Sequence, residues 1–199
     1  MMVNGSIRAF IAIELPPDIQ KNLNQVVLNL RDQMTWIPVR WVSVGNIHLT
    51  LKFLGDVSLS QVELIEQLLN TITLAHDTFK ISVGGVGVFP RPQRPRVIWA
   101  GVDAPPDLVA IQEEIESTTA QVGYIPESRP FSPHLTLGRI SQLVNTSQAN
   151  RIAESLAASK VSSLGNVEVK AVHLIRSELK PTGAVYTRLF SGLLNEIKT

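Results

Sequence analysis

The chain has 199 residues, of which 44% are hydrophobic and 18% are charged, so it can bury a sizeable core as a globular protein. Its 18 Lys and Arg residues against 17 Asp and Glu residues give a formal net charge of +1, which excludes a strong overall field for attracting nucleic acid. The absence of cysteine excludes disulfide frameworks, thiolate zinc sites and cysteine nucleophiles.

The first predicted element is a strand within RAFIAIELPPDI (8–19), followed by a helix that begins at the prolines. The apolar run from Ala9 to Ile13 has neither the basic lead nor the cleavage site of a signal peptide. No run in the chain approaches the roughly 20 apolar residues that a membrane span needs. We therefore expect a cytoplasmic protein that makes no membrane contact. The helix is predicted from apolar residues at helical spacing, namely Ile19, Leu23, Val26, Val27 and Leu30.

The next predicted strand is IHLTLKFLGD (47–56), which turn residues Gly45 and Asn46 precede. A second helix follows it, and two strands, FKISVGGVGVF (79–89) and RVIWAGV (96–102), complete the first half of the chain. The loop FPRPQRPR (89–96) between these strands carries three arginines. It suits an RNA phosphate backbone and an ordinary surface connection equally well. The second helix is predicted from Leu59, Val62, Ile65, Leu69 and Ile72.

The second half repeats this order. RVIWAGVDAPPDL (96–108) resembles the N-terminal strand and its prolines, and PHLTLGRISQ (133–142) repeats His-Leu-Thr-Leu 86 residues after the first copy. Helices are predicted around Leu108–Val122, with Gly123 as a stop, and around 149–156. VEVKAVHLI (167–175) and AVYTRLF (184–190) are predicted as closing strands. The matched order predicts a single domain over 1–199 with an internal repeat at about 7–95 and 96–190.

We predict an α+β fold with two pseudo-symmetric lobes, each an antiparallel sheet backed by helices, and an active-site cleft between them. Because residues i and i+2 of a strand share a face, His48 projects beside Thr50, and His134 beside Thr136. One neutral and one protonated imidazole would act as general base and acid on a phosphodiester, and the hydroxyls would bond its oxygens. This chemistry requires no metal, and we expect no cofactor.

The other two histidines lack this repeated context. His76 closes a predicted helix, where the helix dipole favours a cation, and we expect a structural role. His173 shares a strand face with apolar residues, and we expect a core histidine with a hydrogen-bond partner.

Four segments together resemble the 2H phosphoesterase superfamily, and within it the RNA 2′,3′-cyclic phosphodiesterase branch, also called 2′-5′ RNA ligase or LigT-like. They are RAFIAIELP, NIHLTLKFLG, RPFSPHLTLGR and GAVYTRL, and the resemblance runs from Arg8 to about Leu189. It implies a bilobal α+β fold and hydrolysis of a terminal 2′,3′-cyclic phosphate on RNA or a nucleotide to a 2′-phosphate. It also implies His48 as the acid toward the 3′ oxygen and His134 as the base on water, although the pseudo-symmetry leaves these roles interchangeable by sequence.

The same resemblance suggests that Arg139 contacts phosphate and that Phe53 stacks on a base. Strict strand alternation places both on the face opposite the histidines, so a bulge, a strand end or a long side chain would have to bring them round. Arg129, in the loop before the second motif, is either an RNA contact or a solvated surface charge. No protein partner is evident, and we expect a monomer.

Three alternatives stay open. The protein could join RNA ends through a 2′-5′ bond, which is the same chemistry in reverse. It could hydrolyse another cyclic or 2′-5′ phosphodiester. It could also be a module that binds a nucleotide or RNA without turnover, although binding alone needs no pair of proton-transfer groups.

Overall fold

The structure is a computed structural model and describes residues 5–141, 143–181 and 183–196. Over these residues the predicted order of strands and helices is present, together with a short strand and a 3₁₀ helix ahead of the first motif. The elements are β1 (Ser6–Glu14), α1 (Pro17–Gln33), β2 (Val39–Trp41), η1 (Val44–Asn46), β3 (His48–Ser58), α2 (Leu59–Leu74), β4 (Phe79–Phe89), β5 (Val97–Val102), α3 (Pro106–Gln121), β6 (His134–Ile140), α4 (Thr146–Ala158), β7 (Gly165–Val169), β8 (Ala171–Lys180) and β9 (Gly183–Leu193).

The helices begin with matched signals in the two halves. α1 and α3 both start at the second proline of Pro-Pro-Asp, where the fixed φ of proline suits the first turn and an aspartate follows it. α2 and α4 both start with a capping box, formed by Ser58 with Gln61 and by Asn145 with Gln148. The internal repeat therefore extends to the local chemistry that starts each helix.

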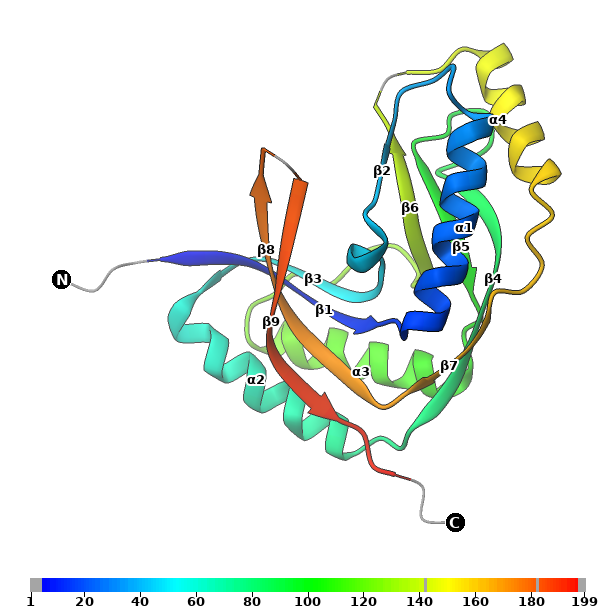
Figure 1. The fold of residues 1–199 in the computed structure, drawn as a ribbon. Helices are drawn as coiled ribbons and strands as arrows, with labels where there is room; N and C mark the ends of the chain where they lie inside the picture. Colours follow the sequence, from blue (N-terminus) through cyan, green and yellow to red (C-terminus); the bar gives the residue numbers. More distant parts are fainter. Residues whose placement is uncertain (1–4, 142, 182, 197–199) are drawn as a thin grey trace.

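All the strands belong to one strongly curved sheet with the order β7-β4-β5-β6-β3-β1-β8-β9, and β2 pairs with β6 off this path. The sheet is narrowest between β3 and β6, where the register records the single pair Leu49 and Leu135. On one side of this junction lies the first lobe, with β3, β1, β8 and β9. On the other lies the second lobe, with β6, β5, β4, β7 and β2. Figure 1 shows the two lobes diverging from the junction, which confirms the predicted bilobal α+β architecture.

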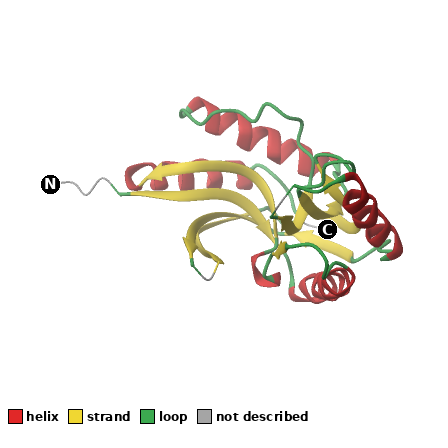
Figure 2. Ribbon diagram, turned by 90° about the horizontal axis from the view of Figure 1, so that it is seen from above, coloured by secondary structure: helices red, strands yellow, loops and turns green. Residues whose placement is uncertain are grey.

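Each lobe carries its helices on one face of its sheet. α2 packs on the first lobe and contacts α3, which lies against β3 (Figure 2). α1 and α4 pack together on the second lobe, against β7 and β4. The main hydrophobic core lies between the helices and the sheet, and the opposite sheet face of each lobe is left to line the space between the lobes. None of the helices in the described part of the chain is long and apolar enough to span a membrane.

The lobes do not coincide with the two halves of the sequence. The predicted strand VEVKAVHLI is two strands separated at Lys170, of which β7 pairs with β4 in the second lobe and β8 pairs with β1 and β9 in the first. Each lobe therefore contains strands and one helix from each half of the sequence. In VEVKAVHLI no turn residue interrupts the pattern of apolar and polar residues, so the sequence predicts one strand. The pattern indicates which side chains are buried and does not indicate which strand each part pairs with.

Candidate active site

The two His-Leu-Thr-Leu copies meet at the junction of the lobes. Leu49 and Leu135 are opposite one another in the β3–β6 pair, and both are fully buried. Extending this antiparallel register by one residue sets His48 opposite Thr136 and Thr50 opposite His134. Side chains at opposite positions lie about 5 Å apart at Cβ. The two imidazoles and two hydroxyls, all half-buried, therefore gather on one face of the sheet, away from the helices.

Both imidazoles are held in the same way. His48 Nδ1 lies 2.8 Å from the Asn46 carbonyl oxygen, and His134 Nδ1 lies 2.7 Å from the Ser132 carbonyl oxygen. A carbonyl only accepts hydrogen bonds, so Nδ1 carries the hydrogen in each ring. Nε2 is then the nitrogen that accepts or donates the mobile proton. Asn46 is itself fixed by a 2.8 Å bond from its amide to the carbonyl of Ala184 in β9.

Aromatic rings surround the two histidines unequally. Phe10 stacks on His48 at 4.5 Å between ring centroids, and Tyr186 meets the same imidazole edge-on at 5.3 Å. His134 has Phe89 edge-on at 4.9 Å. Burial lowers the pKa of His48 below 6.5, while the Asn46 carbonyl and the Glu14 carboxylate act in the opposite direction. Sequence patterns alone do not assign Phe10, Tyr186 or Phe89 to the site.

A β-bulge in each motif decides where the fifth residue after the histidine points. The pairing of β1 with β3 skips Leu51, and the pairing of β5 with β6 skips Leu137. Two consecutive residues are then buried in each strand, after which Phe53 and Arg139 emerge exposed. Phe53 is opposite Phe10 in β1, so it shares the face of His48. Each bulge shifts the phase by one residue, so Phe53 and Arg139 do not lie on the face that strict alternation would give them.

The position of each predicted contact residue follows from these bulges. Phe53 is 68% exposed, and its ring lies 6.2 Å from that of Phe10. The Arg139 guanidinium lies near enough to Tyr186 to oppose the increase in the pKa of that phenol that burial causes. Arg129 is exposed and pairs with Glu127 at 3.4 Å in the loop before β6. No contact recorded within the described ranges joins it to either histidine.

The loop that carries Arg129 is anchored by the first motif. Lys52, whose side chain is buried by the bulge, pairs with Glu116 of α3 and donates a 2.7 Å bond to the carbonyl of Ile125. Glu116 also accepts a hydrogen bond from the backbone of Glu127. A residue of the first motif thus holds the segment that leads into the second.

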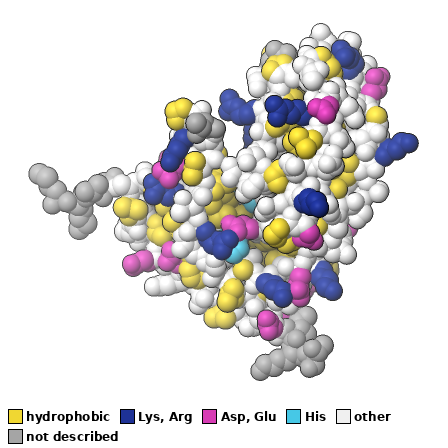
Figure 3. All heavy atoms as spheres, viewed as in Figure 1, with side chains coloured by type: hydrophobic (Ala, Val, Ile, Leu, Met, Phe, Trp, Pro, Cys, Tyr) yellow, Lys and Arg dark blue, Asp and Glu magenta, His cyan; other side chains and the backbone are white. Residues whose placement is uncertain are grey.

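A cavity of about 140 Å³ adjoins His48, and Asn46, Tyr186, Glu14 and Arg188 contribute to its lining. Glu14 forms an ion pair with Arg188 of β9 across the cavity wall. Figure 3 shows the hollow at the centre of this face of the molecule, with hydrophobic side chains in its depth and Lys and Arg side chains on both sides.

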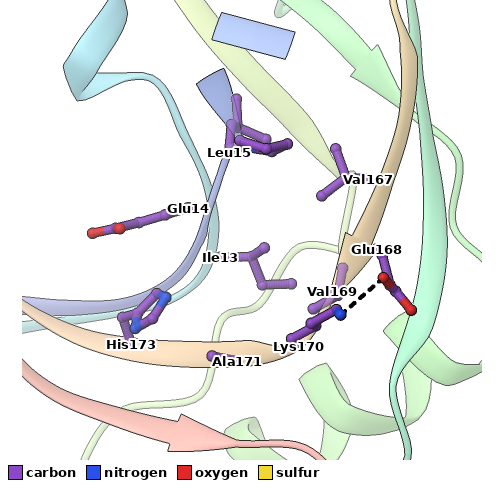
Figure 4. Close-up of a pocket in the computed structure, with 10 residues that line it drawn as sticks. Ile13, Glu14, Leu15, Val167, Glu168, Val169, Lys170, Ala171 and His173 are labelled. Atoms are coloured by element: carbon purple, nitrogen blue, oxygen red, sulfur yellow. Dashed lines mark ion pairs between the residues drawn. The ribbon is translucent and has the colours of Figure 1, made fainter. Parts of the chain in front are cut away.

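Glu14 also lines a second cavity of about 260 Å³ beside the chain crossing between β7 and β8. In Figure 4, Ile13 and Val167 are among its apolar lining residues, and Glu14 points to the side where His173 lies. His173 is buried, and its Nδ1 lies 3.0 Å from Ser191 Oγ, so it has the hydrogen-bond partner expected of a core histidine. Burial lowers its pKa, Glu14 raises it, and Arg188 lowers it.

His76 lies just after α2, and its Nε2 is 2.7 Å from a Glu114 carboxylate oxygen, so it ties the end of that helix to α3. Groups of three or more His, Asp or Glu residues suited to holding a metal ion are absent from the described ranges.

Comparison with known proteins identifies the family. The family model described as LigT-like phosphoesterase matches residues 13–99 and 102–186, which covers both halves of the repeat. The chain belongs to this family. The RNA 2′,3′-cyclic phosphodiesterase of Methanothermobacter thermautotrophicus is 33% identical over 91% of this chain and 95% of the relative. That of Aeropyrum pernix is 35% identical over 81% of this chain and 90% of the relative.

Two solved structures share the fold. The crystal structure of a Thermus thermophilus protein has a TM-score of 0.78 at 25% identity and covers 94% of this chain and 98% of its own. Escherichia coli LigT complexed with 3′-AMP has a TM-score of 0.75 at 26% identity, with coverage of 96% and 99%. The predicted membership of the LigT-like branch is therefore confirmed.

Proposed function

We propose that this protein hydrolyses the terminal 2′,3′-cyclic phosphate of RNA or of a nucleotide to a 2′-phosphate, without a metal ion. The observation that carries the proposal is the junction of the lobes, where two imidazoles with Nδ1 fixed to carbonyls gather beside two threonines. The matching relatives named RNA 2′,3′-cyclic phosphodiesterase support the choice of substrate.

In the proposed reaction, His134 Nε2 takes a proton from water as the water oxygen attacks phosphorus. The bond between phosphorus and the 3′ oxygen breaks, and His48 Nε2 gives its proton to that oxygen, so the products are a 2′-phosphate and a 3′-hydroxyl. Thr50 and Thr136 donate hydrogen bonds to the non-bridging oxygens, whose negative charge makes such bonds strong.

The acid role requires His48 to be protonated, although burial lowers its pKa in the free protein. Two negative charges favour the protonated form, namely Glu14 and the phosphodiester itself once bound. His48 would then acquire its catalytic proton together with the substrate. Phe53, exposed next to Phe10, offers a ring on which the terminal base can stack. Arg139 contacts phosphate from the second lobe.

The test is turnover of a nucleoside 2′,3′-cyclic phosphate, with the product identified by chromatography or phosphorus NMR. We expect the 2′-phosphate, formed at the same rate in the presence of EDTA. Activity that EDTA abolishes and a divalent ion restores would refute the metal-free mechanism. A 3′-phosphate product would leave the histidine pair standing and reject the proposed bond cleavage.

The same assay separates the alternatives. Formation of a 2′-5′ bond from two RNA ends would favour ligation, and turnover confined to another cyclic or 2′-5′ diester would change the substrate. Tight binding without turnover would favour a binding module.

We also propose that the protein acts as a monomer in the cytoplasm. Light scattering after size-exclusion chromatography should therefore give the mass of one chain, and fractionation of cells should recover it with soluble cytoplasmic proteins.

A further inference from the structure

A second arginine lies directly beside Arg139. Where β3 separates from β6 beyond the junction, β2 takes its place at the edge of β6, and Arg40 is the register partner of Arg139. Opposite residues of an antiparallel pair project on the same face, at a Cα separation of about 4.5–5.5 Å. Because the bulge sets Arg139 on the face of His134, Arg40 lies on that face as well.

The neighbours of Arg40 project the other way. Trp41 is opposite Gly138 and Val39 is opposite Ile140, and both packed side chains lie on the core face. A methyl group at Gly138 would lie 2.7 Å from Val39 Cγ1 and 3.0 Å from the Trp41 ring. This close packing fixes the three-residue strand β2 in register, so Arg40 is held toward the space between the lobes.

The pair is electrostatically unfavourable as it stands. Like charges at directly opposite positions destabilise a sheet. Both arginines are exposed, and within the described ranges neither has a carboxylate within 4 Å. Arg129, Arg176 and Arg188, by contrast, each pair with a glutamate. A bound anion would relieve the repulsion between Arg40 and Arg139, and guanidinium groups bind phosphate oxygens in a bidentate manner.

The position of the pair suits a second phosphate. Arg139 lies three residues beyond Thr136, up to about 10 Å along the strand and away from the histidines, and Arg40 is about 5 Å across the sheet from it, on the edge of β6 that β3 occupies at the junction. Arg40 is thus displaced from the phosphate at the histidines toward the rim of the second lobe.

We propose that Arg40, together with Arg139, binds the RNA backbone phosphate that precedes the terminal nucleotide, and thereby favours oligonucleotides over mononucleotides. This inference rests on the proposed function, because it takes the reacting phosphate to lie between the histidines. A mononucleotide 2′,3′-cyclic phosphate has no phosphate at that position. An RNA trinucleotide with the same cyclic end has one.

The first experiment compares kcat/KM for these two substrates in the wild type and in Arg40→Gln. The ratio of the trinucleotide value to the mononucleotide value should fall about tenfold, the effect of losing one hydrogen-bonded contact to a charged group. The salt dependence of the trinucleotide value should weaken by about 0.7 in log–log slope, as for one lost contact to single-stranded nucleic acid. Arg40→Lys should restore part of the ratio. Arg31→Gln, at an exposed arginine in the last turn of α1, removes the same charge elsewhere and should leave the ratio at its wild-type value.

An unchanged ratio in Arg40→Gln would overturn the proposal. Equal losses on both substrates would also overturn it, because Arg40 would then act on the terminal phosphate. A second measurement is independent of turnover, namely anisotropy of a labelled RNA trinucleotide that ends in a 2′-phosphate. Arg40→Gln should weaken its binding about tenfold, and unchanged binding rejects the site. A wild-type protein that binds this RNA through Arg40 but turns over neither substrate would refute the proposed function and leave the phosphate site standing.

Discussion

The neighbourhoods of His48 and His134 are alike in backbone geometry and different in side-chain environment. Each imidazole bonds a carbonyl two residues earlier, each is followed by a threonine at i+2, and each strand has a bulge at the second leucine. Two rings enclose His48, however, where His134 has one close aromatic neighbour. The repeat therefore sets where the two imidazoles lie, and residues from other strands give His48 the more enclosed environment, in which burial lowers its pKa.

The two bulges are likewise alike in backbone geometry and different in the residue that each one buries. The bulge buries Lys52 in the first motif and Gly138 in the second. Lys52 pairs with Glu116, whereas Gly138 leaves room for the packed side chains of β2. One bulge thus anchors the loop before the second motif, and the other holds the strand that carries Arg40.

The largest expected effect comes from removing either histidine. Each general acid or base contributes roughly 10²–10⁴-fold, so His48→Ala and His134→Ala should each lower kcat by that factor. Because the two act as a unit, the double variant should be little worse than the worse single one. Steady-state kinetics measures this, and the folded variant His76→Asn serves as a control outside the site. Near wild-type turnover in either single variant would sink the paired mechanism.

The next largest effect is expected at Lys52, the residue that the bulge of the first motif buries. Lys52→Met leaves the Glu116 carboxylate without its buried partner, and we expect unfolding free energy to fall by about 3 kcal/mol. Adding Glu116→Gln should recover part of this loss, because the glutamine oxygen still accepts from the Glu127 backbone. Urea denaturation of the two single variants and the double variant gives the coupling. Additive effects would show that the pair contributes nothing beyond its separate parts.

A smaller effect is expected at the threonines. Thr50→Ala and Thr136→Ala each lose one bond to a charged phosphate oxygen, worth about 1.5–3 kcal/mol, or roughly 10- to 100-fold in kcat/KM. The melting temperature should change little, since both side chains are only half-buried at the junction. A large drop in melting temperature with unchanged kinetics would assign the hydroxyls to the fold.

The smallest effect distinguishes the two histidines. Glu14 raises the pKa of His48, so Glu14→Gln should lower that pKa further. If His48 is the acid, activity requires its protonated form, and the alkaline limb of the kcat/KM profile moves to lower pH. Movement of the acid limb instead would make His48 the base. Glu168→Gln, which removes a carboxylate that pairs with Lys170 outside the cavity beside His48, is the matched control.

Much of this architecture is predictable from the sequence, because the repeated tetrapeptides, the helical spacing and the Pro-Pro-Asp starts are local patterns. Single-residue insertions in a strand leave no comparable pattern, so the sequence indicates only that Phe53 and Arg139 need a bulge, a strand end or a long side chain to reach the face of the histidines, and the register shows the bulges. Phe10, Tyr186 and Glu14 reach His48 from β1 and β9, and only the register brings them there. The pairing of Arg40 with Arg139 is likewise a property of the sheet, because the two residues are far apart in the chain.

Because the chain crosses from one lobe to the other between β7 and β8, each half of the sequence needs the other to complete a lobe, as the subunits of an obligate dimer need one another. Neither half contains a complete lobe, because the first supplies β1 and β3 to one lobe and β4 to the other, while the second supplies the strands that complete them. A polypeptide cut in the exposed turn at 91–94 would therefore yield two fragments with unfinished sheets. Only the other fragment could supply the missing strands of each one. Enzymatic activity in a cell that makes both fragments would therefore show that the two had assembled.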